Sequence, residues 1–469
     1  FQMFKSYTPK QLVGLLVISS LLLMENIDAN ILNVAIPQMA HSFASTVFTM
    51  KLAVTSYLIG LSVFIPISGW MSDRFGSKKI LMLSIVLFTL MSIQCGLTDS
   101  VPLLVICRLL QGVAGAFMVP VGRLLLLKIF DKSQMVKAYT LMGMPVLLGP
   151  ILAPILGGFL VTYFSWRYIF WVNIPLGLMA LYATIRYIDN YTEEQDKFNF
   201  YSYVFLALSL CCFCFWLDLF LSREISNFTK GMLFSGAVFF GLIYYLIESK
   251  STFPVIRYHL FKLRTFSSCF FSQVIIRASL GGRTFILAVF LEITFKKSAF
   301  AAGFVFIWMS LGVLCSRTVT RKLLEKFGFK RALLVANIGS FIALSMLAMV
   351  NYLGWFLYLA LFLNGVFAAM QFMSLNLLYY ADVENIDYGS AVSLATTWQQ
   401  LGTSLGVIVA AGLLHIANYV SATNFAIASF HYVFFALALI NLSCQFLLNR
   451  LEKTDGQSLI DKKYKKLAT

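Results

Sequence analysis

The feature that most constrains this chain is its series of long apolar runs. Each is close to the ~20 residues that cross a bilayer as a helix, and in lipid only a helix or a closed barrel satisfies its own backbone. The sequence therefore predicts an all-α polytopic membrane protein with 14 transmembrane helices. The first run is too long for a signal peptide and precedes no small-residue cleavage site, so it is expected to span. The runs lie at about 12–33, 47–71, 79–97, 101–127, 136–163, 167–188, 200–221, 230–248, 266–292, 299–320, 332–350, 354–380, 391–413 and 428–448.

The charge distribution supports this interpretation. Charged residues make up 12% of the 469 residues, against about 25% in soluble domains. A net charge of +16 would suggest nucleic acid in a soluble protein, but here Lys and Arg concentrate in alternate loops, as the positive-inside rule describes. We therefore expect cytoplasmic N- and C-termini, no nucleic-acid partner, and a basic tail that contacts membrane lipids. The eight cysteines lie in apolar runs without metal-ligand spacing, so no metal site is expected.

A short charged segment occurs twice in the chain. The first hinge, "DRFGSKK" at residues 73–79, matches the second hinge, "EKFGFKR" at residues 325–331. The first joins runs 2 and 3 and the second joins runs 10 and 11, so the repeat is offset by eight runs. Parallel six-helix halves are one of the known transporter plans, and the offset leaves two additional helices between them. The predicted domains are an N-terminal six-helix bundle (1–190), two additional helices (191–250), a C-terminal six-helix bundle (251–450) and a cytoplasmic tail (451–469).

The hinge residues predict a conformational gate of a major facilitator fold. Gly76 permits a tight turn, and Asp73 can pair with a cation or a helix N-terminus. An ion pair that exists in one conformation only biases the equilibrium between two conformations. The alternative is a solvated charged loop with no such role. The predicted gate residues are Gly69, Asp73, Arg74, Gly76, Arg123, Glu325 and Gly328.

Six further segments carry a resemblance to a known family. They are "IDANILNVAIPQMA" (27–40), "GWMSDRFGSKK" (69–79), "RLLQGVAGAFMVP" (108–120), "GPILAPILGG" (149–158), "SWRYIFWVNIPLG" (165–177) and "GSAVSLATTWQQLGTSLG" (389–406). Together they resemble the major facilitator superfamily and, within it, the fourteen-helix drug:proton antiporters (DHA2), over nearly the whole chain. The chain departs from that family at Asn30, where Thr is usual, and at Glu292, where Gln is frequent. The resemblance implies proton-driven export by alternating access.

Three charged residues inside the apolar runs predict a proton-coupling site. A charge near the bilayer centre costs ~2.5–3.5 kcal/mol on insertion scales, so each such residue is a functional candidate. Glu25 and Asp28 lie three residues apart on one helix face. At ~1.5 Å per residue they lie ~20 Å into the ~30 Å core, the depth also expected for Arg108 when its helix enters from the other side. The acids should titrate as a unit and hold an exchangeable proton; the alternative is a structural salt bridge.

Other polar residues in the apolar runs are predicted to line a substrate cavity. Arg277 falls near the bilayer midplane, and with Arg283 it could bind an anionic group or pair with a neighbouring acid or carbonyl. The cavity candidates are Asn33, Arg277, Arg283, Asn364, Gln371 and Gln399. Proline and glycine in run 5 predict a flexible packing seam rather than packing alone, with Pro145, Gly149, Pro150, Pro154, Gly157 and Gly158 as its members.

These patterns favour a proton-coupled exporter of amphipathic drug-like or toxic small molecules in the bacterial inner membrane. Its partners would be the small-molecule substrate and protons, it would need no cofactor beyond the proton gradient, and a periplasmic adaptor with an outer-membrane channel stays open. One alternative is a dedicated exporter of an anionic metabolite such as a siderophore, which the intramembrane arginines favour. A second is a non-transporting receptor or enzyme, but the chain has no phosphate-binding Gly loop, metal cluster or Ser/His/Asp set.

Overall fold

The fold was obtained as a computed structural model that describes most of the chain. The described residues are 8–45, 47–130, 155–193, 198–220, 225–251, 256–296, 304–420 and 427–460, with the single positions 134, 138, 142, 149, 152 and 153. Within these ranges the regular structure is entirely helical. The predicted all-α fold class is confirmed.

Backbone contacts divide the chain into two compact units. Unit 1 comprises residues 1–129, 152–258 and 384–397, and unit 2 comprises residues 130–151, 259–383 and 398–469. The two additional helices group with unit 1. The predicted borders at residues 190 and 250 follow the sequence repeat instead, and they stay a prediction.

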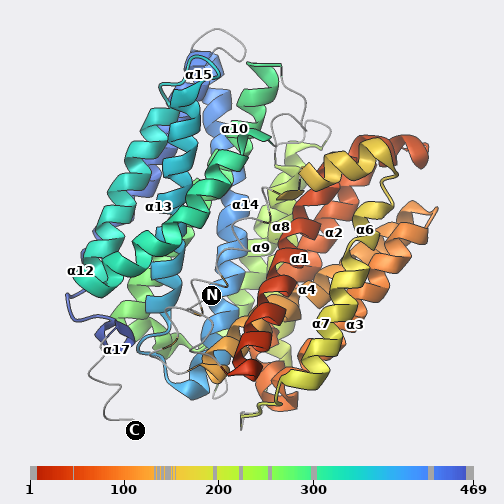
Figure 1. Cartoon of the computed structure of the whole chain (residues 1–469). Helices are drawn as coiled ribbons and strands as arrows, with labels where there is room; N and C mark the ends of the chain where they lie inside the picture. Colours follow the sequence, from red (N-terminus) through yellow and green to blue (C-terminus); the bar gives the residue numbers. More distant parts are fainter. Residues whose placement is uncertain are drawn as a thin grey trace. The chain divides into compact units, whose positions relative to one another are not determined.

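Unit 1 is a bundle of helices that run side by side (Figure 1). Its helices are α1 (Pro9–Ser42), α2 (Val47–Phe75), α3 (Ser77–Leu97), α4 (Val101–Ile129), α6 (Tyr168–Trp171), α7 (Asn173–Tyr187), α8 (Phe200–Leu219) and α9 (Asn227–Glu248). Helix α2 packs on α4, α1 and α8, and α3 packs on α4 and α7. The short helix η3 (Asn385–Asp387) and the first residues of α14 also belong to this unit.

A backbone-to-backbone contact fixes α2 against α4. A Cβ atom on Gly60 would lie 2.4 Å from the carbonyl oxygen of Leu109, and one on Gly112 would lie 2.1 Å from that of Tyr57. Only glycine allows helices to approach so closely. The contact places Tyr57 of α2 next to the turn of α4 that carries Arg108.

Unit 2 is a second helical bundle. Its elements are η2 (Tyr258–Lys262), α10 (Arg264–Ile293), α12 (Ile307–Leu347), α13 (Trp355–Tyr379), α14 (Tyr388–Val420), α15 (Ile427–Ser443), α16 (Gln445–Leu448) and α17 (Gln457–Ile460). Its core includes Phe290, Phe430 and Phe434, with the first two ring centroids 5.1 Å apart. Glycines again bring helices together, because a Cβ atom on Gly406 of α14 would lie 1.8 Å from the carbonyl oxygen of Ala278 on α10.

The described helices agree with the predicted number of spans. Twelve are long and apolar enough to cross a membrane. Helix α12 has 41 residues, about 60 Å of helix or twice a bilayer core, and its backbone leaves helical geometry at Gly328 (φ 75°). It therefore contains predicted runs 10 and 11. Half of run 5 (136–163) lies outside the described residues.

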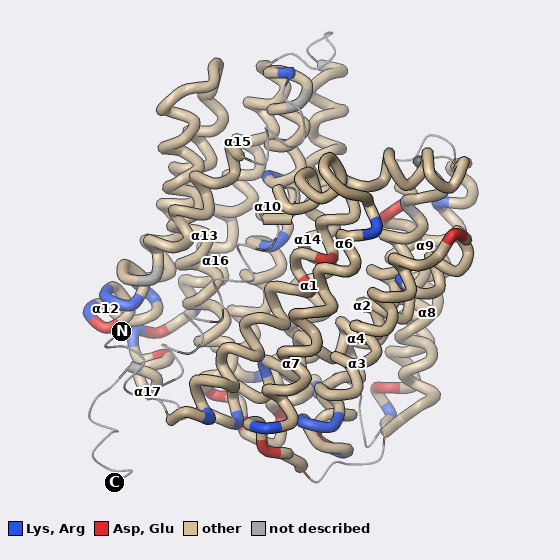
Figure 2. Tube along the Cα trace, turned by 45° about the vertical axis from the view of Figure 1, so that its right-hand side comes forward, with Lys and Arg blue, Asp and Glu red and all other residues tan. Residues whose placement is uncertain are grey.

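Charged residues lie mainly at the ends of the helices, with few along their middle parts (Figure 2). This is the distribution expected of helices that cross a hydrocarbon core, because a charge there must be paired or must face the bundle interior. The few charged residues in the middle parts are therefore the first candidates for a functional site.

Candidate functional site

Asp28 of α1 and Arg108 of α4 form a buried ion pair. The Arg108 Nη1 atom lies 2.6 Å from the Asp28 Oδ2 atom, and both side chains are fully buried. Removing one partner from such a pair would leave an uncompensated buried charge. The predicted meeting of Asp28 and Arg108 inside the bundle is present in the structure, while their role in proton coupling stays a prediction.

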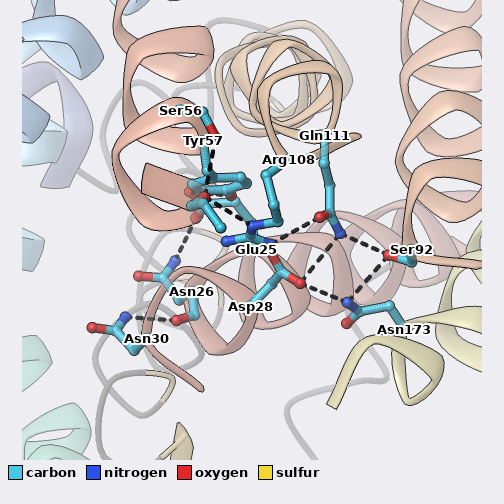
Figure 3. A network of polar contacts seen from close by, with 11 residues as sticks. Glu25, Asn26, Asp28, Asn30, Ser56, Tyr57, Ser92, Arg108, Gln111 and Asn173 are labelled. Atoms are coloured by element: carbon cyan, nitrogen blue, oxygen red, sulfur yellow. Dashed lines mark hydrogen bonds and ion pairs between the residues drawn. The ribbon is translucent and has the colours of Figure 1, made fainter. Parts of the chain in front are cut away.

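Three polar side chains complete the shell around Asp28 (Figure 3). Gln111 accepts a hydrogen bond from Arg108 at 2.8 Å and donates one to the Asp28 Oδ1 atom at 3.2 Å. Asn173 of α7 donates to the same oxygen at 2.8 Å. Ser92 of α3 accepts hydrogen bonds from both amides. Each carboxylate oxygen thus receives hydrogen bonds from helices other than α1, which holds Asp28 in one orientation.

Glu25 contacts a different set of groups, one helical turn from Asp28. The Tyr57 hydroxyl donates to Glu25 Oε1 at 3.5 Å, and the Asn26 amide donates to Glu25 Oε2 at 3.0 Å. The Arg108 guanidinium carbon lies 4.4 Å from the centroid of the Tyr57 ring, a cation–π distance. Tyr57 therefore links the groups around Glu25 to those around Asp28. Its hydroxyl contacts Glu25, and its ring face contacts Arg108.

Part of the first hinge is a buried network, while Arg74 and Phe75 are exposed. Lys128 of α4 lies 2.6 Å from Asp73, and the two side chains are 8% and 3% exposed. A Cβ atom on Gly69 would lie 2.1 Å from the carbonyl oxygen of Gly389 at the start of α14, and one on Gly389 would lie 2.3 Å from Asp73 Oδ2. Gly76 has a φ of 101°, a region that favours glycine.

Two arginines lie near the first hinge. Arg74 places its guanidinium carbon 5.7 Å from the centroid of the Trp70 ring. Arg123 is buried, and its Nη1 atom donates to Thr396 at 3.2 Å. Gly69, Asp73 and Arg123 thus contact other helices of unit 1, whereas Arg74 contacts Trp70 of its own helix. The role of these residues as a gate stays a prediction.

The second hinge has a more open environment. Glu325 pairs with Arg321 four residues earlier at 2.8 Å, and both side chains are well exposed. Gly328 has a φ of 75° and ends the first half of α12. The two hinges share a glycine turn, but only the first has a buried acid. Both the gate and the solvated loop stay open for the second hinge, and the gate role of Glu325 and Gly328 stays a prediction.

A small cavity lies inside unit 2, and three predicted substrate residues line it: Arg277 and Arg283 of α10 and Gln371 of α13. Its volume is about 20 Å³. We call it the unit 2 cavity, and its lining consists of Gln273, Ile276, Arg277, Leu280, Arg283, Ala368, Gln371, Phe372 and Asn441.

The other predicted substrate residues have different positions. Gln399 is not part of the cavity lining. It accepts a hydrogen bond at 3.4 Å from Arg277, which is part of the lining, and donates one to Asn376. Asn364 is buried on α13 and is not part of the lining. The side chain of Asn33 lies outside the described residues.

The predicted seam of run 5 is only partly described. Gly149, Gly157 and Gly158 are helical and buried. Pro145, Pro150 and Pro154 lie outside the described residues. The role of this seam stays a prediction.

Sequence reasoning missed Tyr57, Ser92, Gln111 and Asn173. One signal was present, because an uncharged polar residue in an apolar run is itself a candidate. Gln111 also lies three residues after Arg108 and so shares its helix face. The contacts of Ser92 and Asn173 depend on how α3 and α7 pack, which spacing along the chain does not show. Gln273 and Asn441 of the unit 2 cavity were missed for the same reason.

Comparisons with known proteins agree with this architecture. The model of the Major Facilitator Superfamily matches residues 18–283, more than half of the chain. Proteins named "Putative multidrug resistance protein MdtD" from Salmonella heidelberg and Salmonella typhi are each 34% identical over 445 residues, covering 93% of this chain and 94% of theirs. The structure of the human organic anion transporter MFSD10 matches with a TM-score of 0.66 and 13% identity, over 94% of this chain and all of that one.

Together, the helical membrane bundle and these relatives define a multi-pass membrane transporter, not an enzyme. The chain belongs to the major facilitator superfamily.

Proposed function

We propose that this transporter exports amphipathic, drug-like small molecules in exchange for protons. The observation that carries the proposal is the Asp28 carboxylate, buried in the bundle and held by Arg108, Gln111 and Asn173. A buried, titratable group in a membrane span is a functional candidate by default. The multidrug resistance name of the 34% identical relatives supports the substrate class.

The polar shell suggests how Asp28 would carry a proton. Ionised Asp28 is stabilised by the Arg108 guanidinium and by two amide donors. Protonation removes the charge that Arg108 neutralises, so the ion pair must loosen and the α1–α4 contact must change. Glu25 would be a second proton site coupled to the first, since the Tyr57 side chain contacts both Glu25 and Arg108. Substrate and proton would then compete for one set of groups.

Alternating access would use the first hinge as a gate. The Asp73–Lys128 pair and the Gly69–Gly389 approach link α2, α4 and α14 at one end of unit 1. A pairing available in only one conformation shifts the conformational equilibrium by its differential free energy. The protein would lie in the bacterial inner membrane with both termini cytoplasmic, an orientation that the Lys and Arg bias favours.

The test measures proton release from the purified full-length chain. Ethidium added to weakly buffered, detergent-solubilised protein should release protons, detected with a pH-sensitive dye. Asp28→Asn should reduce this release and ethidium transport in proteoliposomes to background. Asp189→Asn is the control, because Asp189 is an exposed acid that pairs with Lys10. Unaltered transport and an unaltered pH profile in Asp28→Asn would disprove the proton assignment.

A further inference from the structure

One face of α10 presents polar residues to the interior of unit 2. Gln273, Arg277, Leu280 and Arg283 follow one another at spacings of four, three and three residues, so they share a helix face. Gln371 and Phe372 of α13 and Asn441 of α15 line the unit 2 cavity opposite them. The four polar residues Gln273, Arg277, Arg283 and Gln371 therefore all line the unit 2 cavity.

Among the residues that the structure describes, the lining of the unit 2 cavity has two cationic side chains and no carboxylate. Arg283 is 4% exposed. Arg277 is half-buried, with its guanidinium carbon 4.7 Å from the centroid of the Phe372 ring and its Nη2 atom donating to Gln399. This is a positively charged space in the part of a membrane helix where charge is most costly.

Several buried polar atoms at this site have no hydrogen-bond partner in the described part of the chain. Among the described residues, the Nε and Nη2 atoms of Arg283 and both amide atoms of Gln273 have no hydrogen-bond partner. Gln371 is different, since its amide donates to Asn337 and to Asn441. A buried charge without a counter-ion or hydrogen bonds is strongly unfavourable, so the folded protein tolerates Arg283 at a cost that a bound anion would offset.

We propose that the unit 2 cavity binds the carboxylate of an amphipathic transported molecule, with Arg283 as its principal partner. The planar guanidinium fork matches a carboxylate in two parallel hydrogen bonds, and the Gln273 amide can donate a further one. A volume of about 20 Å³ is close to that needed for a single water, so only a headgroup enters. Ile276, Leu280 and Phe372 provide apolar surface around the headgroup. This inference rests on the proposed export function and adds amphipathic carboxylates to the substrates that the function covers.

The test compares two probes that differ only in charge. Dansylglycine carries a carboxylate and dansylglycinamide carries the neutral amide. Binding to the purified full-length chain in detergent is followed by dansyl fluorescence. The wild type should bind dansylglycine at least about tenfold more tightly than dansylglycinamide. Arg283→Gln should remove this preference and leave dansylglycinamide binding unchanged, and Arg283→Lys should retain part of it.

Controls separate the charge effect from misfolding. Arg321→Gln removes an exposed cation that pairs with Glu325, so it should keep the full preference. A thermal melt shows whether each variant is folded. If Arg283→Gln does not fold, the Arg283→Lys measurement and the wild-type preference still decide. Equal binding of both probes by the wild type, or a preserved preference in folded Arg283→Gln, would overturn the proposal.

Two further arms identify the ligand and separate this proposal from the export mechanism. Chloride and sulfate are added as competitors; if millimolar chloride displaces dansylglycine completely and binds in its absence, the site takes inorganic anions and the substrate assignment falls. Asp28→Asn should keep the preference for dansylglycine, because binding in detergent needs no proton gradient. Unaltered transport in Asp28→Asn with an intact preference would mean that the proton assignment fails and this proposal holds. Loss of transport in Asp28→Asn with no preference in the wild type would mean the reverse.

Discussion

Arg108 and Arg283 are both buried arginines on membrane-spanning helices, one in each unit, but their surroundings differ. Arg108 contacts the Asp28 carboxylate at 2.6 Å, the Gln111 amide oxygen at 2.8 Å and the Tyr57 ring. Arg283 lines a cavity whose described lining residues include no acid. Burial alone therefore does not reveal what an intramembrane arginine does. The first is neutralised by the protein itself, and the second has its charge available for a ligand.

The largest effect is expected when the paired arginine is removed. Arg108→Met leaves the Asp28 carboxylate buried without its counter-ion and should cost ~3–5 kcal/mol of folding free energy. Transport should be lost as well. The measurement is unfolding of the purified protein in mixed detergent micelles, followed by far-UV circular dichroism.

A double variant shows whether pairing is the cause. Adding Asp28→Asn to Arg108→Met removes both charges, so most of the lost stability should return. If the double variant is as unstable as Arg108→Met alone, the ion pair is not what stabilises this region, and the contrast with Arg283 loses its basis.

A smaller effect is expected from weakening the shell around the pair. Asn173→Leu removes the 2.8 Å hydrogen bond to Asp28 and should cost about 1–3 kcal/mol. Because that bond holds the Asp28 carboxylate in one orientation, the rate of transport should fall. Thr184→Val on the same helix is the control, since Thr184 donates only to the Ala180 carbonyl. A transport rate that is the same in all three proteins would contradict a positioning role for Asn173.

The smallest effect should have the opposite sign. Arg283→Met removes a buried charge that no acid lining the unit 2 cavity neutralises, and it should stabilise the ligand-free protein by about 0.5–2 kcal/mol, as is common where a binding site is kept at the expense of stability. Thermal melting of the two proteins in the same detergent measures this difference. Destabilisation comparable to that of Arg108→Met would show that Arg283 has a structural partner.

Much of the fold could be predicted because the lipid environment restricts the possible structures so severely. Apolar run length identified the helices, and the repeated hinge located the turn at Gly328 that lies inside the 41-residue α12. The grouping of the additional helices with unit 1 could not be predicted. It depends on contacts such as the 2.6 Å hydrogen bond from Thr55 to Asp218, which join residues far apart in the sequence.

The depth of the candidate site's residues along their helices was predictable from the sequence, but the neighbours that their side chains contact were not. Counting residues from the ends of the runs brought Asp28 and Arg108 to the same level. It could not show that Glu25, on the same face of α1, would contact Tyr57 and Asn26. Rotation about a helix axis is set by packing, and this also explains why Arg277 and Arg283 line the unit 2 cavity while Asn364 does not.

The small size of the unit 2 cavity has a consequence for the breadth of cargo. A space of about 20 Å³ cannot distinguish one carbon skeleton from another, since the skeleton stays outside it. Compounds with unrelated scaffolds would be handled alike if each ends in a free acid. Conversely, an antibiotic would escape such a pump through esterification of that one group, without any redesign of its shape.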